Sequence, residues 1–144
     1  MRKILVLILV SVFSLGTYAA GRKPVLYKDL PEKVQTVVKS NYDQKDIQLI
    51  TYVRTSPKHN RYQFIVADGT TFEYNDKAEL LKATNADGIK DAFVHKEVLN
   101  YVKKSFPNAT ITRYVWQKYR QTVRLNDKMT VIFSKKGKFL RIED

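Results

Sequence analysis

The chain contains no cysteine and only two histidines, His59 and His95. Without cysteine there is no disulfide framework, no thiolate nucleophile and no zinc finger or zinc ribbon. Neither histidine has a nearby serine on a strained, glycine-rich turn, so we interpret both as surface residues rather than members of a triad. The five glycines are scattered and the acidic residues follow no calcium-loop pattern. We therefore expect a protein without catalysis, cofactor or metal.

Long apolar runs are also scarce. The one long run, residues 4–15, follows Arg2 and Lys3 and has 12 residues, whereas a membrane-spanning helix needs about 20. Thr17 and Ala19 come after it at the spacing that signal peptidase requires. The sequence predicts a signal peptide over residues 1–19 and no membrane span. We expect the mature chain, residues 20–144, to be periplasmic or secreted.

Acidic residues are outnumbered, with 14 Asp and Glu against 26 Lys and Arg, which gives a formal net charge of +12. The excess is uneven: residues 89–144 hold 13 basic and 5 acidic residues, whereas residues 20–88 hold 11 and 9. The content of 44% hydrophobic and 12% aromatic residues is typical of a globular protein. The second half is therefore the part that we expect to attract an acidic partner.

The second half repeats the pattern of the first. A shift of 64 residues aligns Val34 with Val98, and beyond the loop of residues 55–60 a shift of 59 aligns Phe64 with Val123. A single length change in one loop is what a duplicated unit produces, because loops tolerate insertions. We expect residues 20–144 to form a single domain of two repeats, about 29–83 and 93–142, that share one core.

Each repeat begins with a pattern that predicts a helix. Apolar residues recur there at helical spacing: Leu30, Val34, Val37, Val38 and Tyr42 in the first repeat, and Val94, Val98, Tyr101, Val102 and Phe106 in the second. Asp29, with Glu32 three residues later, has the spacing of a capping box at the helix start.

Antiparallel strands are expected after each helix. Alternation on both sides of Asp68–Gly69 predicts a hairpin with a three-residue turn, which places Phe64 opposite Phe72. The same parity places Val123 opposite Val131 in the second repeat. The sequence thus predicts an α+β fold of two tandem helix-plus-antiparallel-strand repeats, with the helices packed on one face of the sheet.

Some of these positions carry a resemblance to a known family. They are Leu30–Pro31, the hairpin Tyr62-x-Phe64-x-Val66-x-Asp68-Gly69, and the stretch Phe133-x-x-x-Gly137-x-Phe139-Leu140. The pattern resembles the PepSY-like exported proteins, whose fold is similar to that of beta-lactamase inhibitor protein. The chain departs from it at Lys128 and Ala78, where the family pattern has glycine. The resemblance implies a non-enzymatic periplasmic protein, with an inhibitor-like role as one option and the open sheet face as the binding face.

Alternate strand positions form the sheet face turned away from the helices. Eight of them are our candidate partner-binding residues: Leu49, Val53, Ile65, Arg113, Val115, Gln117, Arg124 and Ile132. One interpretation is a solvated face with scattered apolar residues. The hypothesis that we carry forward is a docking surface for an acidic protein partner, with the arginines supplying charge-assisted contacts.

Residues 113–124 offer an alternative, because they mix cations with aromatic rings as a groove for nucleic acid or an anionic envelope polymer does. Tyr114 and Trp116 align with Ile50 and Tyr52 of the first repeat, and this favours burial of both rings beneath the helix. We therefore expect a protein partner and keep electrostatic binding of an anionic envelope polymer or nucleic acid as the alternative, with nucleic acid the less expected of the two.

Overall fold

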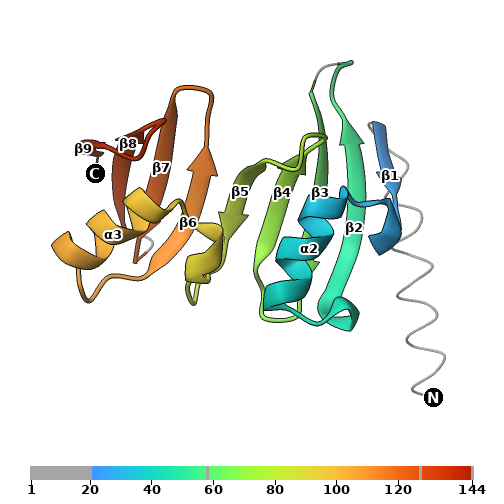
Figure 1. Ribbon diagram of the computed structural model, residues 1–144, viewed down its shortest axis with the longest axis horizontal. Helices are drawn as coiled ribbons and strands as arrows, with labels where there is room; N and C mark the ends of the chain where they lie inside the picture. Colours follow the sequence, from blue (N-terminus) through green and yellow to red (C-terminus); the bar gives the residue numbers. More distant parts are fainter. Residues whose placement is uncertain (1–20, 58, 127, 144) are drawn as a thin grey trace.

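The computed structural model describes residues 21–57, 59–126 and 128–143 (Figure 1). The predicted signal peptide lies outside the described residues. In chain order the elements are β1 (Arg22–Pro24), the 3-10 helix η2 (Tyr27–Asp29), α2 (Glu32–Asn41), η3 (Gln44–Asp46), β2 (Ile47–Arg54), β3 (Asn60–Val66), β4 (Thr71–Asn75), β5 (Leu80–Thr84), η4 (Asp91–Phe93), α3 (Lys96–Ser105), β6 (Ile111–Trp116), β7 (Arg120–Leu125), β8 (Met129–Ser134) and β9 (Phe139–Glu143).

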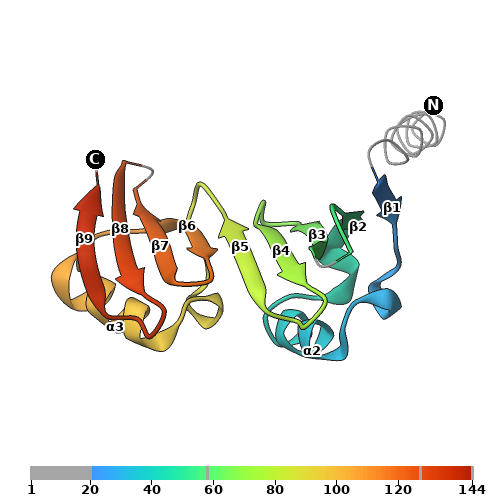
Figure 2. The ribbon, with the colours of Figure 1, turned by 90° about the horizontal axis from the view of Figure 1, so that it is seen from above.

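The described strands form one antiparallel sheet, in which each strand pairs with the next along the chain from β1 to β9. Both α-helices lie against the same face of this sheet (Figure 2). The opposite face, which we call the open face, carries no helix in the described part of the chain. This arrangement confirms the predicted α+β class and the predicted side of the helices.

The two repeats are confirmed and they share a strand. η2, α2 and the start of β2 lie 64 residues before η4, α3 and the start of β6, and β5 lies 59 residues before β9. β5 pairs with β4 as β9 pairs with β8, and it pairs with β6 as β1 pairs with β2. β5 is therefore both the last strand of the first repeat and the first strand of the second, which makes the sheet continuous.

The hairpins have the predicted register. Phe64 lies opposite Phe72, and Val123 lies opposite Val131. Gly69 adopts the left-handed backbone that the first turn requires, with φ of +92°. In the second turn Asn126 has φ of 51°, and asparagine tolerates this region better than most residues because its short amide bonds locally.

Side chains between the helices and the sheet form one core that includes both repeats. Val34, Val38, Val98 and Val102 from the helices are at most 2% exposed, as is Phe72 from the sheet. Fully burying a side chain of this size stabilises the fold by about 1.5–3 kcal/mol.

One predicted core position is wrong. Val37 is 39% exposed, whereas its counterpart Tyr101 is half-buried and stacks on Phe139 with ring centroids 4.9 Å apart. Both residues lie at the margin of the apolar stripe. A tyrosine reaches the core from that position and a valine is too short to do so.

The predicted capping box is also wrong. α2 begins at Glu32 with Pro31 as its N-cap and without a side-chain cap, and the Asp29 carboxylate instead accepts a hydrogen bond from the Leu26 amide at 2.9 Å. Leu30 is extended, with φ of −67° and ψ of 148°, because a residue before proline disfavours the helical region. Asp29 is therefore separated from the helix by two extended residues.

A polar junction joins the repeats beside β5. Asn85 is 7% exposed, and its Nδ2 donates to Thr70 Oγ1 at 2.8 Å. Tyr42 donates its hydroxyl to Asp68 Oδ2 at 3.0 Å, and Lys90 Nζ lies 4.1 Å from the centroid of the Tyr42 ring. These contacts connect the first hairpin and α2 to the segment that leads into the second repeat.

Candidate protein-docking face

Strand register defines the composition of the open face. One row of directly opposite residues crosses it from β2 to β9: Thr51, Gln63, Glu73, Lys82, Val115, Thr122, Ile132 and Arg141. Their neighbours along the strands, such as Phe64, Ala83 and Val123, are buried on the helix side. Because side chains alternate along a strand, the row faces away from the helices.

A second row, two residues further along each strand, brings two predicted site residues together. It contains Ile65, Thr71, Thr84, Arg113, Arg124, Thr130 and Glu143. Arg113 is exposed, Arg124 is half-buried, and the two are direct cross-strand neighbours. Like charges in directly opposite positions disfavour the isolated sheet, so this pair concentrates positive charge at the middle of the second repeat.

Arginine and lysine are segregated between the two sides of the molecule. Among the described arginines only Arg54 lies off the open face, and the rest lie on it: Arg22, Arg61, Arg113, Arg120, Arg124 and Arg141. Among the described strands, by contrast, only β5 places a lysine, Lys82, on this face. Arginine binds carboxylates through a planar fork with two parallel hydrogen bonds, which the lysine ammonium cannot do.

The predicted apolar residues of the second repeat lie between these arginines. Val115 is half-buried, and Ile132 is 2% exposed, although no helix covers this face. Ile132 has Thr122 and Arg141 as its cross-strand neighbours. We call Val115 and Ile132, between which Thr122 lies in the row, the apolar centre; Val115 is its accessible residue, and cationic and hydroxyl side chains lie around it.

The predicted residues of the first repeat lie at the other end of the open face. Leu49 is 50% exposed with φ of 56°, where the register of β2 shifts, and together with the half-buried Ile65 it lines a hollow of about 340 Å³. Val53 is only 4% exposed. The hollow is also lined by Arg22, Glu73 and Lys82, so the first-repeat end combines apolar groups with charges of both signs.

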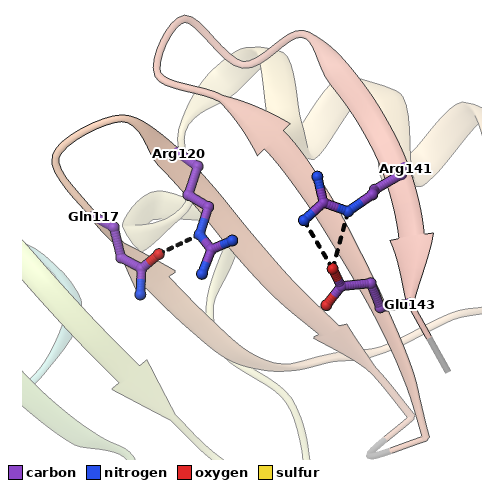
Figure 3. Close-up of polar contacts among 4 residues, drawn as sticks. All are labelled: Gln117, Arg120, Arg141 and Glu143. Atoms are coloured by element: carbon purple, nitrogen blue, oxygen red, sulfur yellow. Dashed lines mark hydrogen bonds and ion pairs between the residues drawn. The ribbon is translucent and has the colours of Figure 1, made fainter.

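Two arginines that the sequence reasoning missed frame the second-repeat end (Figure 3). Gln117, predicted on the strand, lies in the turn after β6 and accepts a hydrogen bond from Arg120 Nε at 2.5 Å. Arg141 forms an ion pair with Glu143, with 2.8 Å between Nη2 and Oε1. The alternation that placed Arg124 outward also places Arg120 outward, so the signal for Arg120 was present.

Two of the three aromatic residues of the segment 113–124 face the helices, as predicted from the repeat alignment, whereas Tyr119 is 74% exposed in the turn after β6. Tyr114 is 2% exposed, and burial raises the pKa of its hydroxyl well above the ordinary value. Trp116 is half-buried against the core, with its ring centroid 5.9 Å from that of His95. Neither of these two rings is on the open face, so neither contributes to the mixed cationic and aromatic groove that the sequence alternative needs.

The remaining possibilities from the sequence are a histidine for catalysis, a metal site and a membrane span. The exposed His59 bonds to the Ser56 hydroxyl, with 2.7 Å between Nδ1 and Oγ. Within residues 21–57, 59–126 and 128–143, no three histidine, aspartate or glutamate residues group in a way that could hold a metal ion. No helix in the same ranges has the length and apolar character needed to cross a membrane.

Comparison with known proteins agrees with this fold. The model of the family described as "Putative beta-lactamase-inhibitor-like, PepSY-like" matches the chain twice, over residues 19–82 and 60–141. The two matches overlap over residues 60–82, which run from β3 into the shared strand β5. No curated protein matches the chain.

Three solved structures have a similar fold. Two are from Bacteroides vulgatus. One, described as a "putative periplasmic protein of unknown function", has 19% identity and a TM-score of 0.76, and the match covers 86% of this chain and 100% of that one. The other, also described as putative and periplasmic, has 20% identity and a TM-score of 0.77, with 88% and 99% covered. The third, a "putative calcium-regulated periplasmic protein" from Bacteroides thetaiotaomicron, has 17% identity and a TM-score of 0.74, with 85% and 97% covered.

Proposed function

Because the chain belongs to the PepSY-like, beta-lactamase-inhibitor-like family, we propose that it is an exported, non-catalytic protein-binding module that docks an acidic protein through its open face. The predicted leader and the description of the structural relatives as periplasmic support a periplasmic or secreted location. The inhibitor-like name of the family supports a role in which binding is itself the activity.

The observation that carries the proposal is the segregation of arginine onto the open face. A surface that served only solubility would favour lysine, as the described helices and turns of this chain do. Arginine is enriched in protein interfaces whereas lysine is depleted. The chemistry of this face therefore fits carboxylates on a partner.

The geometry indicates how the partner would sit. Arg113 and Arg124 lie side by side, next to the apolar centre of Val115 and Ile132. The expected partner surface has an apolar contact at its centre, with aspartate or glutamate beside it. The positive charge of the second half raises the rate of encounter, and this effect weakens with added salt.

The test is binding of an identified partner by charge-reversed variants of the exported protein. A partner captured from the native envelope is purified, and its affinity is measured for the wild type, for Arg113→Glu/Arg124→Glu and for Lys96→Glu/Lys104→Glu. The lysine variant has the same change in net charge but carries it on α3, on the opposite side of the sheet. We expect the arginine variant to lose at least tenfold in affinity, about 1.4 kcal/mol or more, and the lysine variant to stay within about threefold. Equal losses in both variants would contradict docking through the open face.

A second candidate is electrostatic binding of an anionic envelope polymer. It is favoured by the lysines of α3, Lys96, Lys103 and Lys104, which extend the positive charge of the second repeat beyond the open face. Binding of this kind falls steeply between low and high salt and is similar for any polyanion. A complex that persists at high salt with one discrete protein would exclude it.

A further inference from the structure

A groove on the helix side of the second repeat has the features of a small-molecule site, and it is separate from the open face. Its volume is about 520 Å³, and residues from five separate segments line it. The walls are apolar and aromatic, and include Leu80, Phe93, Tyr114 and Trp116. Two exposed lysines, Lys118 and Lys135, lie at its rim. A concave, mostly apolar pocket with a few polar groups is the usual form of a ligand site.

Buried polar contacts hold one wall of the groove in place. Gln121 is 0% exposed and accepts a hydrogen bond from the Tyr114 hydroxyl, while its Nε2 donates to the carbonyl oxygens of Ser134 at 3.2 Å and Lys135 at 3.0 Å. The turn that carries Lys135 is thus fixed to the sheet from below. A site whose polar groups are held before binding loses less free energy in ordering them.

The first repeat lacks this set of groups at the equivalent positions. Tyr62 stands where the second repeat has Gln121, and Asp76 stands where it has Lys135. The corresponding groove of the first repeat is lined by Tyr52, Tyr62 and Asp29 among others. Burial and the nearby Asp76 carboxylate raise the pKa of the Tyr52 hydroxyl. The first groove therefore has one basic and one acidic residue in its lining, Lys23 and Asp29, whereas the second has two lysines and one glutamate.

We propose that the groove of the second repeat binds a small aromatic carboxylate. The ring lies against Trp116 and the apolar walls, and the carboxylate lies between the ammonium groups of Lys118 and Lys135. The lining also includes one carboxylate, Glu79, which accepts a hydrogen bond from Asn75 Nδ2 at 2.7 Å; the two lysines outnumber it and leave the lining with net positive charge. Aromatic stacking and two cations together select a ligand that has both an aromatic ring and a negative charge.

The chain provides its own reporter, because Trp116 is its only tryptophan. The exported full-length mature protein is titrated with phenylacetate, which has an aromatic ring and a carboxylate, and with phenylacetamide, which has the same shape without the charge. We expect a saturable change in Trp116 fluorescence with phenylacetate in about the millimolar range, and binding of phenylacetamide that is about tenfold weaker.

Matched lysine variants test the position of the carboxylate. Lys118→Gln/Lys135→Gln is expected to weaken phenylacetate binding about tenfold, because both charged contacts are lost. Lys136→Gln/Lys138→Gln removes the same charge from exposed residues of the same turn that do not line the groove, and is expected to bind within about twofold of the wild type. Equal weakening by the two pairs overturns the proposal, as does equal binding of the acid and the amide, or no saturable change.

Two further measurements distinguish this proposal from binding in the first-repeat groove and from binding of a polypeptide end. Amide NMR shifts on adding phenylacetate are expected at residues 92–95 and 114–118, and equal shifts at Tyr52 and Tyr62 in the first repeat would overturn the assignment to the second groove. The tripeptide Gly-Gly-Phe with a free carboxylate tests a polypeptide end as the ligand. Binding of the tripeptide more than tenfold tighter than phenylacetate would overturn the proposal of a small free acid.

Discussion

The turn between β8 and β9 provides a sharp test of the packing that holds the second repeat together. Gly137 is buried with φ of +89°, and a Cβ added there would lie 2.6 Å from Glu97 Cβ and 3.0 Å from His95 Nδ1. Ordinary contacts between carbon atoms are about 3.5–4.0 Å. The Gly137→Ala substitution therefore adds backbone strain and steric overlap at the start of α3.

Both costs have known sizes. A left-handed backbone costs an L-residue about 1–2 kcal/mol, and overpacking costs typically 1–3 kcal/mol. Alanine recovers about 0.4–1 kcal/mol by restricting the unfolded chain. We expect Gly137→Ala to lower the free energy of unfolding by about 2–4 kcal/mol, a large share of the 5–15 kcal/mol typical of a protein.

The first repeat supplies the opposite substitution as a control. Ala78 stands at the equivalent position with φ of 63°. Replacing it with glycine relieves the left-handed strain, but it also increases the freedom of the unfolded chain and removes a partly buried methyl group. We expect Ala78→Gly to change the free energy of unfolding by no more than about 1 kcal/mol in either direction, with a gain if the strain relief dominates.

The assay is urea unfolding of both variants and the wild type, followed by circular dichroism, with the slope checked for two-state behaviour. The reasoning is refuted if Gly137→Ala unfolds at the wild-type midpoint. It is also refuted if Ala78→Gly is destabilised as much as Gly137→Ala, because that result would mean that the close contact with α3 contributes nothing.

Three further predictions follow from single contacts. Gln121→Leu should lower the free energy of unfolding by about 2–3 kcal/mol, because the buried Tyr114 hydroxyl loses the acceptor of its hydrogen bond. In a double-mutant cycle, adding Tyr114→Phe should recover part of that loss. Trp116→Ala should cost about 2 kcal/mol rather than the 3–5 kcal/mol of a fully buried ring, since Trp116 is half-buried; a loss above 4 kcal/mol would place it in the core. Burial raises the pKa of Asp68, but hydrogen bonds from Thr70 and Tyr42 more than offset this and hold it below the ordinary value. The stabilisation from the Asp68 carboxylate is therefore present above the unfolded pKa of about 4 and is lost as the pH falls through the folded pKa. Asp68→Asn should therefore reduce the loss of stability at acid pH, measured as urea midpoints at a series of pH values. An unchanged dependence on pH would contradict this.

The spacing of apolar residues in the sequence predicted the fold because the buried positions have almost the same spacing. The registers of Phe64 with Phe72 and Val123 with Val131 follow from parity alone, since the alternative registers would place charged or polar groups in the core. The exposure of Val37 could not be read from spacing, because it depends on the length of the side chain at the margin of a stripe. Buried Gln121 could not be predicted from polarity, since its burial depends on three partners that only the folded chain brings together.

Part of the open face could be predicted, because side chains alternate between the two faces along a strand. Alternation placed Arg113, Arg124 and Val115 outward, where the structure has them. Gln117 follows the end of its strand, and strand ends are not fixed by alternation. β1 was missed because Arg22, Lys23 and Pro24 have no strand pattern of their own. They pair because β2 offers them an edge.

The shared strand and the arginines bear directly on the docking that we propose for the open face. The repeat offsets place Leu49 at the position of Arg113, and Ile65 at that of Arg124. At these two open-face positions the first repeat is apolar and the second is cationic, whereas Glu73 stands where the second repeat has Ile132. Because β5 fixes the halves in one sheet, these two ends have a constant order and distance. A partner that bound only through charge would not need the apolar end, and one that bound only through burial would not need the arginines. If the proposed docking holds, the partner carries both an apolar and an acidic patch, and Arg113→Leu/Arg124→Ile should weaken its measured affinity without lowering the urea midpoint of unfolding.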